Sequence, residues 1–153
     1  MEAKMEQRKK RIMFVGRSQA GKTTLTQYIT MQALNYHKTQ TIEIVDGHLI
    51  DTPGEYVEQR GFYGALSVTA ANAEAIALVQ SATEDGTMFA PGFGSMFCGK
   101  PVIGIITKLD IASKEQVERA GQYLALAGAA TRFQVSSVTG EGMDVLEQWM
   151  QAI

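Results

Sequence analysis

The chain has 153 residues, of which 45% are hydrophobic and 20% charged, and its formal net charge is −2. This balance indicates one globular domain with a sizeable core, and it argues against a nucleic-acid partner because the only basic cluster is residues 8–11. No apolar run approaches the length of a membrane span, so we expect no membrane partner. Cys98 is the only cysteine, which excludes an intrachain disulfide and favours a reducing, cytoplasmic location.

The first half of the chain predicts a strand, a helix and then a hairpin. Residues 12–16 form a buried apolar run, and the helical period of apolar residues extends over 23–33. Two extended runs, 41–45 and 48–52, then flank the Asp-Gly pair at 46–47. Because Asp-Gly between two extended runs is typical of a tight turn, we expect an antiparallel hairpin here.

The second half alternates helices with strands. The expected elements are helix 61–70, strand 75–79, an irregular loop over 83–99, strand 101–106, helix 113–127, strand 132–136 and helix 142–153. Ser113 and Gln116 have the spacing of a capping box at the start of one helix. The sequence therefore predicts an α/β fold: a mostly parallel six-stranded sheet, helices on both faces and the one antiparallel hairpin. Ligands of such sheets bind at the carboxyl ends of the strands.

Residues 16–23 have the pattern G-x-x-x-x-G-K-T, directly after a strand and before a helix. In this arrangement successive backbone N–H groups and the helix N-terminus hold phosphates. The Lys22 ammonium would reach the β- and γ-phosphates, and the Thr23 hydroxyl would ligate Mg²⁺. A glycine-rich turn without a ligand would leave Lys22 and the threonines beside it unexplained. The predicted phosphate-binding residues are Gly16, Ser18, Gln19, Ala20, Gly21, Lys22, Thr23 and Thr24.

The segment Asp51-Thr52-Pro53-Gly54 follows the next strand end. The Asp51 carboxylate is a candidate Mg²⁺ ligand, through a water molecule. Gly54 lets the backbone approach closely, so that its N–H can meet the γ-phosphate.

Two further strand ends carry groups suited to a guanine base. In Thr107-Lys108-Leu109-Asp110 the Asp110 carboxylate can accept from two donors on one edge of guanine, and adenine lacks that pair of donors. The Lys108 stem can lie over the base. In the segment Ser136-Ser137-Val138 the Ser137 N–H can meet the guanine carbonyl oxygen. Thr107 replaces the commoner asparagine, which affects the expected affinity rather than the choice of base. The predicted ligands are GTP or GDP with Mg²⁺.

The four motifs in this order resemble the Ras-like P-loop GTPases of the translation-factor class. Residues 21–26, 36–43, 50–56 and 90–93 are more specifically similar to the EutP/PduV family of ethanolamine- and propanediol-utilisation proteins. The resemblance implies a single G domain over residues 12–153 after a basic tail, 1–11. It also implies a bacterial protein of ethanolamine or propanediol catabolism, associated with a microcompartment.

Catalysis and switching involve further residues of the Ras-like pattern. Thr39 or Thr41 is expected to reach Mg²⁺ and the γ-phosphate, and the family pattern favours Thr39. Glu55 stands where Ras-like enzymes often place a water-orienting glutamine, and its charge would repel the γ-phosphate, so we expect slow hydrolysis. The candidate catalytic residues are Lys22, Thr39, Gly54 and Glu55, and the candidate metal ligands are Thr23, Thr39 and Asp51. Arg17 and Arg60 are candidate charge-stabilising arginines.

Three functions stay open from the sequence. The first is a GTP-binding switch with slow, Mg²⁺-dependent GTP hydrolysis. The second, implied by the family's acetate-kinase assignment, is transfer of a γ-phosphate to acetate, with ATP as a possible donor. The third is a nucleotide-dependent scaffold that docks to a microcompartment shell or enzyme partner through the apolar segment 88–97. The same segment would alternatively pack its aromatic side chains onto the domain's own core.

Overall fold

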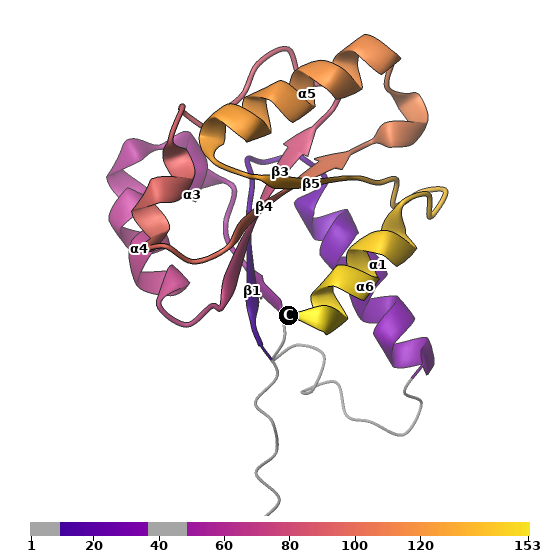
Figure 1. Cartoon of the computed structure of the whole chain (residues 1–153), viewed down its shortest axis with the longest axis horizontal. Coiled ribbons are helices and arrows are strands. Elements are labelled where there is room, and N and C mark those ends of the chain that lie inside the picture. The colour runs from indigo at the N-terminus through magenta and orange to yellow at the C-terminus, as the bar shows by residue number, and fades with distance from the viewer. Residues whose placement is uncertain (1–9, 37–48) are drawn as a thin grey trace, which may run out of the picture.

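The computed structural model describes residues 10–36 and 49–153 of the chain. Strands and helices alternate through most of these residues (Figure 1). In chain order the elements are β1 (Ile12–Val15), α1 (Lys22–Tyr36), β2 (Leu49–Asp51), α3 (Glu55–Glu58), the 3-10 helix η1 (Arg60–Phe62), α4 (Tyr63–Ala70), β3 (Ala75–Ser81), η2 (Phe93–Phe97), β4 (Val102–Thr107), η3 (Leu109–Ile111), α5 (Lys114–Ala127), β5 (Thr131–Gln134) and α6 (Met143–Ala152).

The described strands form one five-stranded sheet in the order β2-β1-β3-β4-β5. Every neighbouring pair is parallel; Ile12 of β1, for example, lies opposite Leu49 of β2 and Ala75 of β3. All five carboxyl ends therefore meet at one edge. Because connections between parallel strands cross over the sheet, helices cover both of its faces.

The predicted six-stranded sheet and antiparallel hairpin are not supported. Leu49–Asp51, which we expected to be half of the hairpin, pairs in parallel with β1. The other expected half, residues 41–45, lies outside the described residues. The described sheet has five strands, each paired in parallel with its neighbours, and among the described residues no strand pairs antiparallel with β2.

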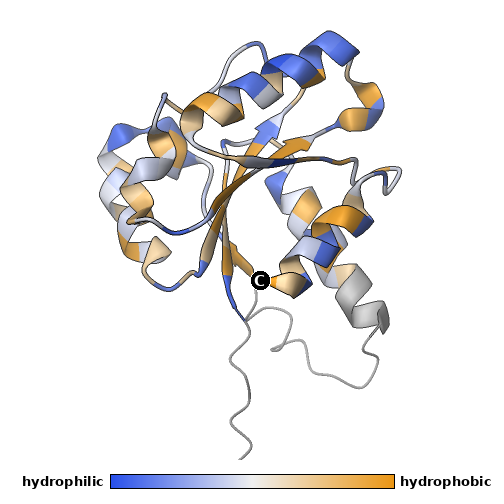
Figure 2. Ribbon diagram, in the orientation of Figure 1, coloured by the Kyte–Doolittle hydropathy of each residue, from blue (hydrophilic) through white to orange (hydrophobic). Residues whose placement is uncertain are grey.

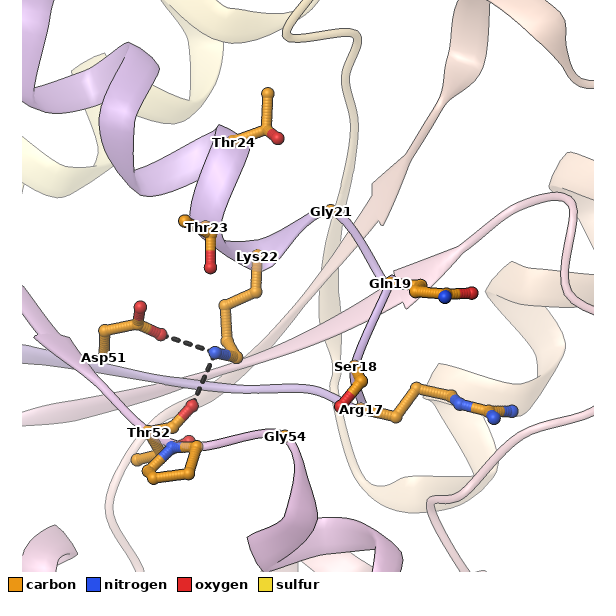
Figure 3. Close-up of a pocket in the computed structure, with 11 residues that line it drawn as sticks. Arg17, Ser18, Gln19, Gly21, Lys22, Thr23, Thr24, Asp51, Thr52 and Gly54 are labelled. Carbon is orange, nitrogen blue, oxygen red and sulfur yellow. Dashed lines mark hydrogen bonds and ion pairs between the residues drawn. The ribbon is translucent and has the colours of Figure 1, made fainter.

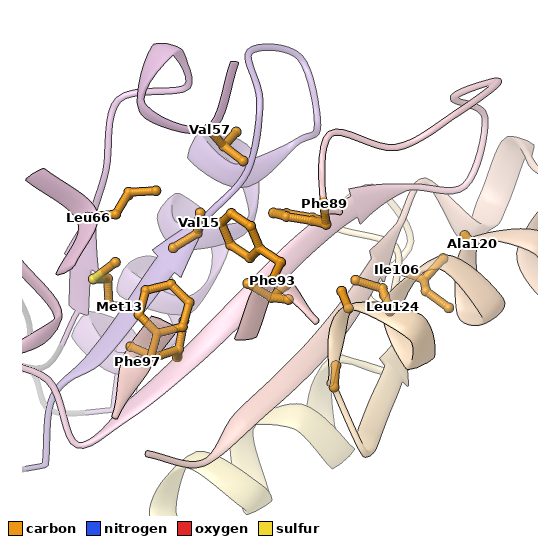
Figure 4. Close-up of a cluster of buried hydrophobic side chains, with 14 of the residues drawn as sticks. Met13, Val15, Val57, Leu66, Phe89, Phe93, Phe97, Ile106, Ala120 and Leu124 are labelled. Atoms are coloured by element: carbon orange, nitrogen blue, oxygen red, sulfur yellow. The ribbon is translucent and has the colours of Figure 1, made fainter. Parts of the chain in front are cut away.

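Two buried clusters lie on opposite faces of the sheet. Helices α1 and α6 cover one face, where Leu25 and Leu146 are fully buried against β1 and β3 (Figure 1). The other face lies beneath α4 and α5, with Leu66 and Leu124 in its cluster (Figure 4). Apolar residues concentrate in the strands, whereas much of the outer surface of α5 is hydrophilic (Figure 2). This burial of strands on both faces explains why they read as continuous apolar runs.

The segment 88–97 belongs to the core rather than to an exposed patch. Phe89, Phe93 and Phe97 are each at most 4% exposed, and the ring of Phe93 lies 5.2 Å from that of Phe89 and 5.8 Å from that of Phe97 (Figure 4). The ring of Tyr63 meets Phe93 edge-on at 5.6 Å. The expectation of an apolar docking surface is therefore wrong, and the alternative that these aromatics pack onto the domain's own core is confirmed.

The helix predictions are confirmed with small shifts. Ser113 Oγ accepts the Gln116 N–H at 3.1 Å and the Gln116 side chain accepts the Ser113 N–H at 2.9 Å, which is the expected capping box. The helix expected over 61–70 is divided into η1 and α4. In the part of the chain described, none of the helices combines the length and apolarity needed to cross a membrane.

Candidate nucleotide-binding site

The loop between β1 and α1 contains two residues with a positive φ angle, a conformation that most residue types disfavour. Gly21 has φ +90°, the left-handed region that favours glycine, and Gln19 also has a positive φ of 70°. Gly16 packs so closely on β3 that a Cβ there would lie 2.9 Å from the Val79 carbonyl oxygen. The two glycines of the pattern are thus needed for different reasons: backbone conformation at Gly21 and close approach to β3 at Gly16.

The loop forms one wall of a cavity of about 550 Å³ at the carboxyl edge of the sheet (Figure 3). The opposite wall is the segment after β2. Most of the predicted phosphate-binding residues and the predicted metal ligands Thr23 and Asp51 are brought together here. The lining residues are Arg17, Ser18, Gln19, Gly21, Lys22, Thr23, Thr24, Asp51, Thr52, Pro53 and Gly54.

Lys22 connects the two walls. The residue is 7% exposed, and its ammonium donates to Asp51 Oδ1 at 2.6 Å and to the Thr52 carbonyl oxygen (Figure 3). The Thr52 hydroxyl in turn donates to the Phe14 carbonyl of β1 at 2.7 Å, which fixes this segment to the sheet. Since a buried ammonium requires such partners, Asp51 and the Thr52 carbonyl hold Lys22 in place at the centre of the cavity.

Gly54 lies directly against the loop. A Cβ at Gly54 would come within 2.4 Å of the Ser18 nitrogen, so only glycine fits without moving one of the two backbones. Glu55, the predicted water-orienting residue, is exposed at the start of α3. One turn later Glu58 accepts a hydrogen bond from the Ser18 N–H at 2.8 Å. Sequence reasoning missed Glu58, because its contact joins segments 40 residues apart in the chain.

Of the two candidate charge-stabilising arginines, only Arg17 lines the cavity. Its side chain extends away from Lys22 and pairs with the Glu84 carboxylate at 3.6 Å (Figure 3). Arg60 is exposed in η1. Glu84 was not predicted either, although its position just after β3, at the same sheet edge, is compatible with such a contact.

The Thr107–Asp110 segment is joined directly to the phosphate loop. The Thr107 hydroxyl, which is buried, donates to the Ala20 carbonyl, and Lys108 Nζ donates to the Gln19 carbonyl at 2.9 Å. Lys108 has φ +63°, a left-handed conformation that turns the chain sharply at the end of β4. Threonine at 107 therefore still provides a side-chain hydrogen bond to the loop where asparagine is the commoner residue.

Asp110 and Ser136 meet at the carboxyl ends of β4 and β5. The Ser136 hydroxyl, fully buried, donates to Asp110 Oδ1 at 2.8 Å. The Ser136 Oγ also accepts hydrogen bonds from the N–H groups of Val138 and Thr139, at 3.2 Å and 3.1 Å. Val138 itself is 80% exposed. The two segments that we expect to contact a guanine base are thus held together by one serine.

The donor set for a metal ion fits magnesium. Thr23 and Asp51 offer a hydroxyl and a carboxylate on facing walls of the cavity, which are the hard oxygen ligands that Mg²⁺ prefers. Within residues 10–36 and 49–153 there is no group of three or more His, Cys, Asp or Glu side chains that would hold a metal by itself. Magnesium bound with a nucleotide takes few protein ligands, so this set is sufficient. Thr39 and Thr41 lie outside the described residues.

Comparison with known sequences gives a consistent group of relatives. The family model PduV-EutP, described as ethanolamine utilisation – propanediol utilisation, matches residues 9–152. The propanediol utilization protein PduV of Citrobacter freundii is 44% identical over 144 residues, or 94% of each chain. The probable acetate kinase EutP of Escherichia coli K12 is 28% identical over 144 residues, which cover 94% of this chain and 91% of that protein.

Among solved structures, translation elongation factor SelB of Methanococcus maripaludis, in complex with the GTP analogue GppNHp, has a similar fold. The TM-score is 0.66 and the sequence identity 20%, over 95% of this chain. The matched region is only 33% of the SelB chain. At this identity the likeness shows the fold alone.

Proposed function

The chain belongs to the PduV-EutP family, as its motifs predicted, and on that basis we propose that it binds GTP and GDP with Mg²⁺ and hydrolyses GTP slowly. The observation that carries the proposal is the pair of hydrogen bonds from Thr107 and Lys108 to the phosphate loop. They fix a phosphate-binding element and a base-recognition element in one unit. The role in ethanolamine or propanediol utilisation follows the family description, and association with a microcompartment stays a prediction from the resemblance.

Selection of guanine is assigned to Asp110. The Ser136 hydroxyl binds one carboxylate oxygen of Asp110, which orients the group and leaves acceptor sites for the two donors on the guanine edge. Adenine would leave this carboxylate facing an acceptor and a C–H group, at the cost of an unsatisfied charge. The Lys108 stem and the Ser137 N–H are the proposed contacts to the base plane and to its carbonyl oxygen.

The phosphates are assigned to the loop Gly16–Thr24. Its backbone N–H groups and the N-terminus of α1 would bind the phosphate oxygens, and Lys22 would exchange its present partners for the β- and γ-phosphates. Thr23 and Asp51 would hold Mg²⁺, Asp51 through a water molecule, with Thr39 as the proposed further ligand. When bound, Mg²⁺ supplies the positive charge that offsets the charge developing on the phosphate oxygens.

We propose that GTP hydrolysis is slow because the residue that follows Gly54 is a glutamate, Glu55. The carboxylate of Glu55 is free of burial and can accept a hydrogen bond from an attacking water. Its negative charge, however, repels the negatively charged γ-phosphate. Gly54, packed on Ser18, would direct its N–H toward the same phosphate.

Phosphate transfer to acetate is the second candidate, favoured by the name of the EutP relative and by the position of Arg17 on the cavity wall. In this reaction an acetate oxygen would attack the γ-phosphorus, the bond to the β–γ bridging oxygen would break, and the nucleoside diphosphate would leave with acetyl phosphate as the product. Arg17 would have to release Glu84 to bind the acetate carboxylate.

One experiment distinguishes the two candidates. Inorganic phosphate and acetyl phosphate are measured from GTP and from ATP, with and without acetate, for the wild type, for Asp110→Asn and for the remote control Asp144→Asn on α6. GTP-selective phosphate release that ignores acetate and is reduced only in Asp110→Asn supports the GTPase. Acetyl phosphate formed from ATP and unaffected by Asp110→Asn would overturn it in favour of an acetate kinase.

A further inference from the structure

We propose that Glu58 is a specificity-determining residue that lowers the affinity of the site for a nucleoside triphosphate relative to the diphosphate. It does so because its carboxylate occupies a phosphate-loop amide, the Ser18 N–H, that a triphosphate would contact. The inference rests on the proposed function, since it concerns the same site. It adds to that function a residue that neither the G-x-x-x-x-G-K-T pattern nor the Asp51–Gly54 segment includes.

The hydrogen bond between Glu58 and Ser18 is supported by the packing of α3. Glu58 Oε1 lies 2.8 Å from the Ser18 nitrogen, 40 residues away in the chain. Its backbone is held by the first turn of α3, where the Glu58 N–H donates to the Gly54 carbonyl at 3.3 Å, and by the burial of its neighbour Val57. The carboxylate is therefore placed on the loop by a short, anchored helix rather than by a free surface side chain.

The contact lies at the γ-phosphate side of the cavity. Ser18 is the loop residue against which Gly54 packs, and Gly54 ends the segment that begins with Asp51, the partner of Lys22. The two groups of the loop that face this segment, the Ser18 N–H and the Lys22 ammonium, are thus both engaged by carboxylates. Each carboxylate makes a contact that a phosphate oxygen would otherwise make.

The consequence differs between the two nucleotides. A γ-phosphate at this end of the loop would compete with Glu58 for the Ser18 N–H, and two anions cannot share one donor without repulsion. A diphosphate lacks that group and leaves the contact in place. Triphosphate binding would therefore require the Glu58 carboxylate to leave the Ser18 N–H.

The test is the ratio of two dissociation constants in Glu58→Gln and Glu58→Ala. Binding of GDP and of a non-hydrolysable GTP analogue, with Mg²⁺, is measured by titration calorimetry. We expect the triphosphate to bind roughly two- to fivefold more tightly in both variants, the size of an exposed charge interaction, with GDP unchanged. Glu118→Gln is the control: it removes one negative charge from an exposed position on α5, outside the residues that line the cavity, and should leave the ratio as in the wild type.

An equal change for both nucleotides would show a merely structural contact and overturn the inference, as would an unchanged ratio in both Glu58 variants. ADP with an ATP analogue, and pyrophosphate with tripolyphosphate, are titrated in parallel. Preference for adenine would contradict the proposed guanine selection, while the ratio for the adenine pair would still decide the role of Glu58. A wild type that binds none of these compounds would overturn both proposals.

Discussion

The Ser136 hydroxyl bridges the two segments expected to contact the base: it donates to Asp110 Oδ1 at 2.8 Å and accepts two backbone N–H groups from the turn after β5. These three bonds use all the hydrogen-bonding capacity of one hydroxyl group. Because Ser136 is fully buried, none of them competes with bulk water. The orientation of Asp110 and the shape of the 136–139 turn are therefore set by the same atom.

Replacing Ser136 with alanine should weaken GTP binding. Loss of the bond to Asp110 is expected to reduce the affinity for GTP by about five- to tenfold, the value of one net hydrogen bond. Titration calorimetry with GDP and GTP measures it. Ser137→Ala is the control, since only its backbone N–H is proposed to contact the base. An equal loss in both variants would contradict the orienting role of Ser136.

Replacing Thr107 with valine should separate the base-recognition segment from the phosphate loop. Valine keeps the shape but leaves the Ala20 carbonyl without its donor, at a cost of about 1–2 kcal/mol in the free energy of unfolding. We also expect weaker binding of GTP, because the phosphate loop loses its hydrogen bond to Thr107. Chemical denaturation and calorimetry measure the two effects. Thr107→Ser retains the hydroxyl and should restore most of both; if it does not, the methyl packing rather than the hydrogen bond is responsible.

A matched pair of glycine substitutions tests the close packing of Gly54 on the loop. Gly54 has ordinary helical dihedral angles, so Gly54→Ala introduces no backbone strain, only a Cβ 2.4 Å from the Ser18 nitrogen. We expect a loss of about 1–3 kcal/mol in stability, together with reduced phosphate release from GTP. Gly64 in α4 has nothing within 4 Å of an added Cβ, so Gly64→Ala should stabilise the protein by about 0.5–1 kcal/mol. Thermal unfolding of both variants provides the comparison, and equal effects would rule out the contact.

The sequence predicted the parts of this site that depend on local chemistry. The loop around Lys22 carries its geometry in its own glycines, and the Ser113 capping box involves residues three apart, so both could be found from spacing alone. The α/β fold followed in the same way from the alternation of apolar runs with helical periods. These features need no knowledge of distant contacts.

What the sequence did not predict depends on packing between distant segments. The pairing of β2 with β1, in which Leu49 lies opposite Ile12, joins strands from different parts of the chain, and the residues of neither strand specify its partner. Glu58 and Glu84 reach the loop only after α3 and β3 are positioned, across 40 residues in the case of Ser18 and Glu58. Likewise, the burial of Phe93 depends on its packing against Tyr63 of α4, a contact that the residues around Phe93 do not specify.

Truncation of Phe93 tests whether the 88–97 segment serves the core. Phe93 is 4% exposed and touches aromatic rings on both sides, so Phe93→Ala should cost about 3–5 kcal/mol in the free energy of unfolding. Val68→Ala, at a position 73% exposed on α4, should change stability by less than about 0.5 kcal/mol. Denaturant unfolding measures both. A Phe93→Ala variant as stable as the wild type would contradict the assignment of segment 88–97 to the core.

The carboxyl group of Glu147 on α6 should make the stability of the protein depend on pH. Burial, and next the negative charge of Asp144, raise the pKa of Glu147 above its ordinary value, and its Oε1 is buried without a hydrogen-bond partner. The folded state therefore binds more protons than the unfolded state between the ordinary and the raised pKa. In that interval stability falls as pH rises, and the loss persists at neutral pH.

Removing this charge should therefore stabilise the protein at neutral pH but not in acid. We expect Glu147→Gln to raise the unfolding temperature at pH 7 by roughly 1–3 °C, which corresponds to about 0.5–1 kcal/mol for a chain of this size. At about pH 4, near the ordinary glutamate pKa, the difference from wild type should shrink toward zero. Glu118→Gln, on the exposed side of α5, controls for a general effect of net charge. A stabilisation of the same size at both pH values, or one shared by Glu118→Gln, would contradict this assignment, because neither would follow the protonation of a buried carboxyl group.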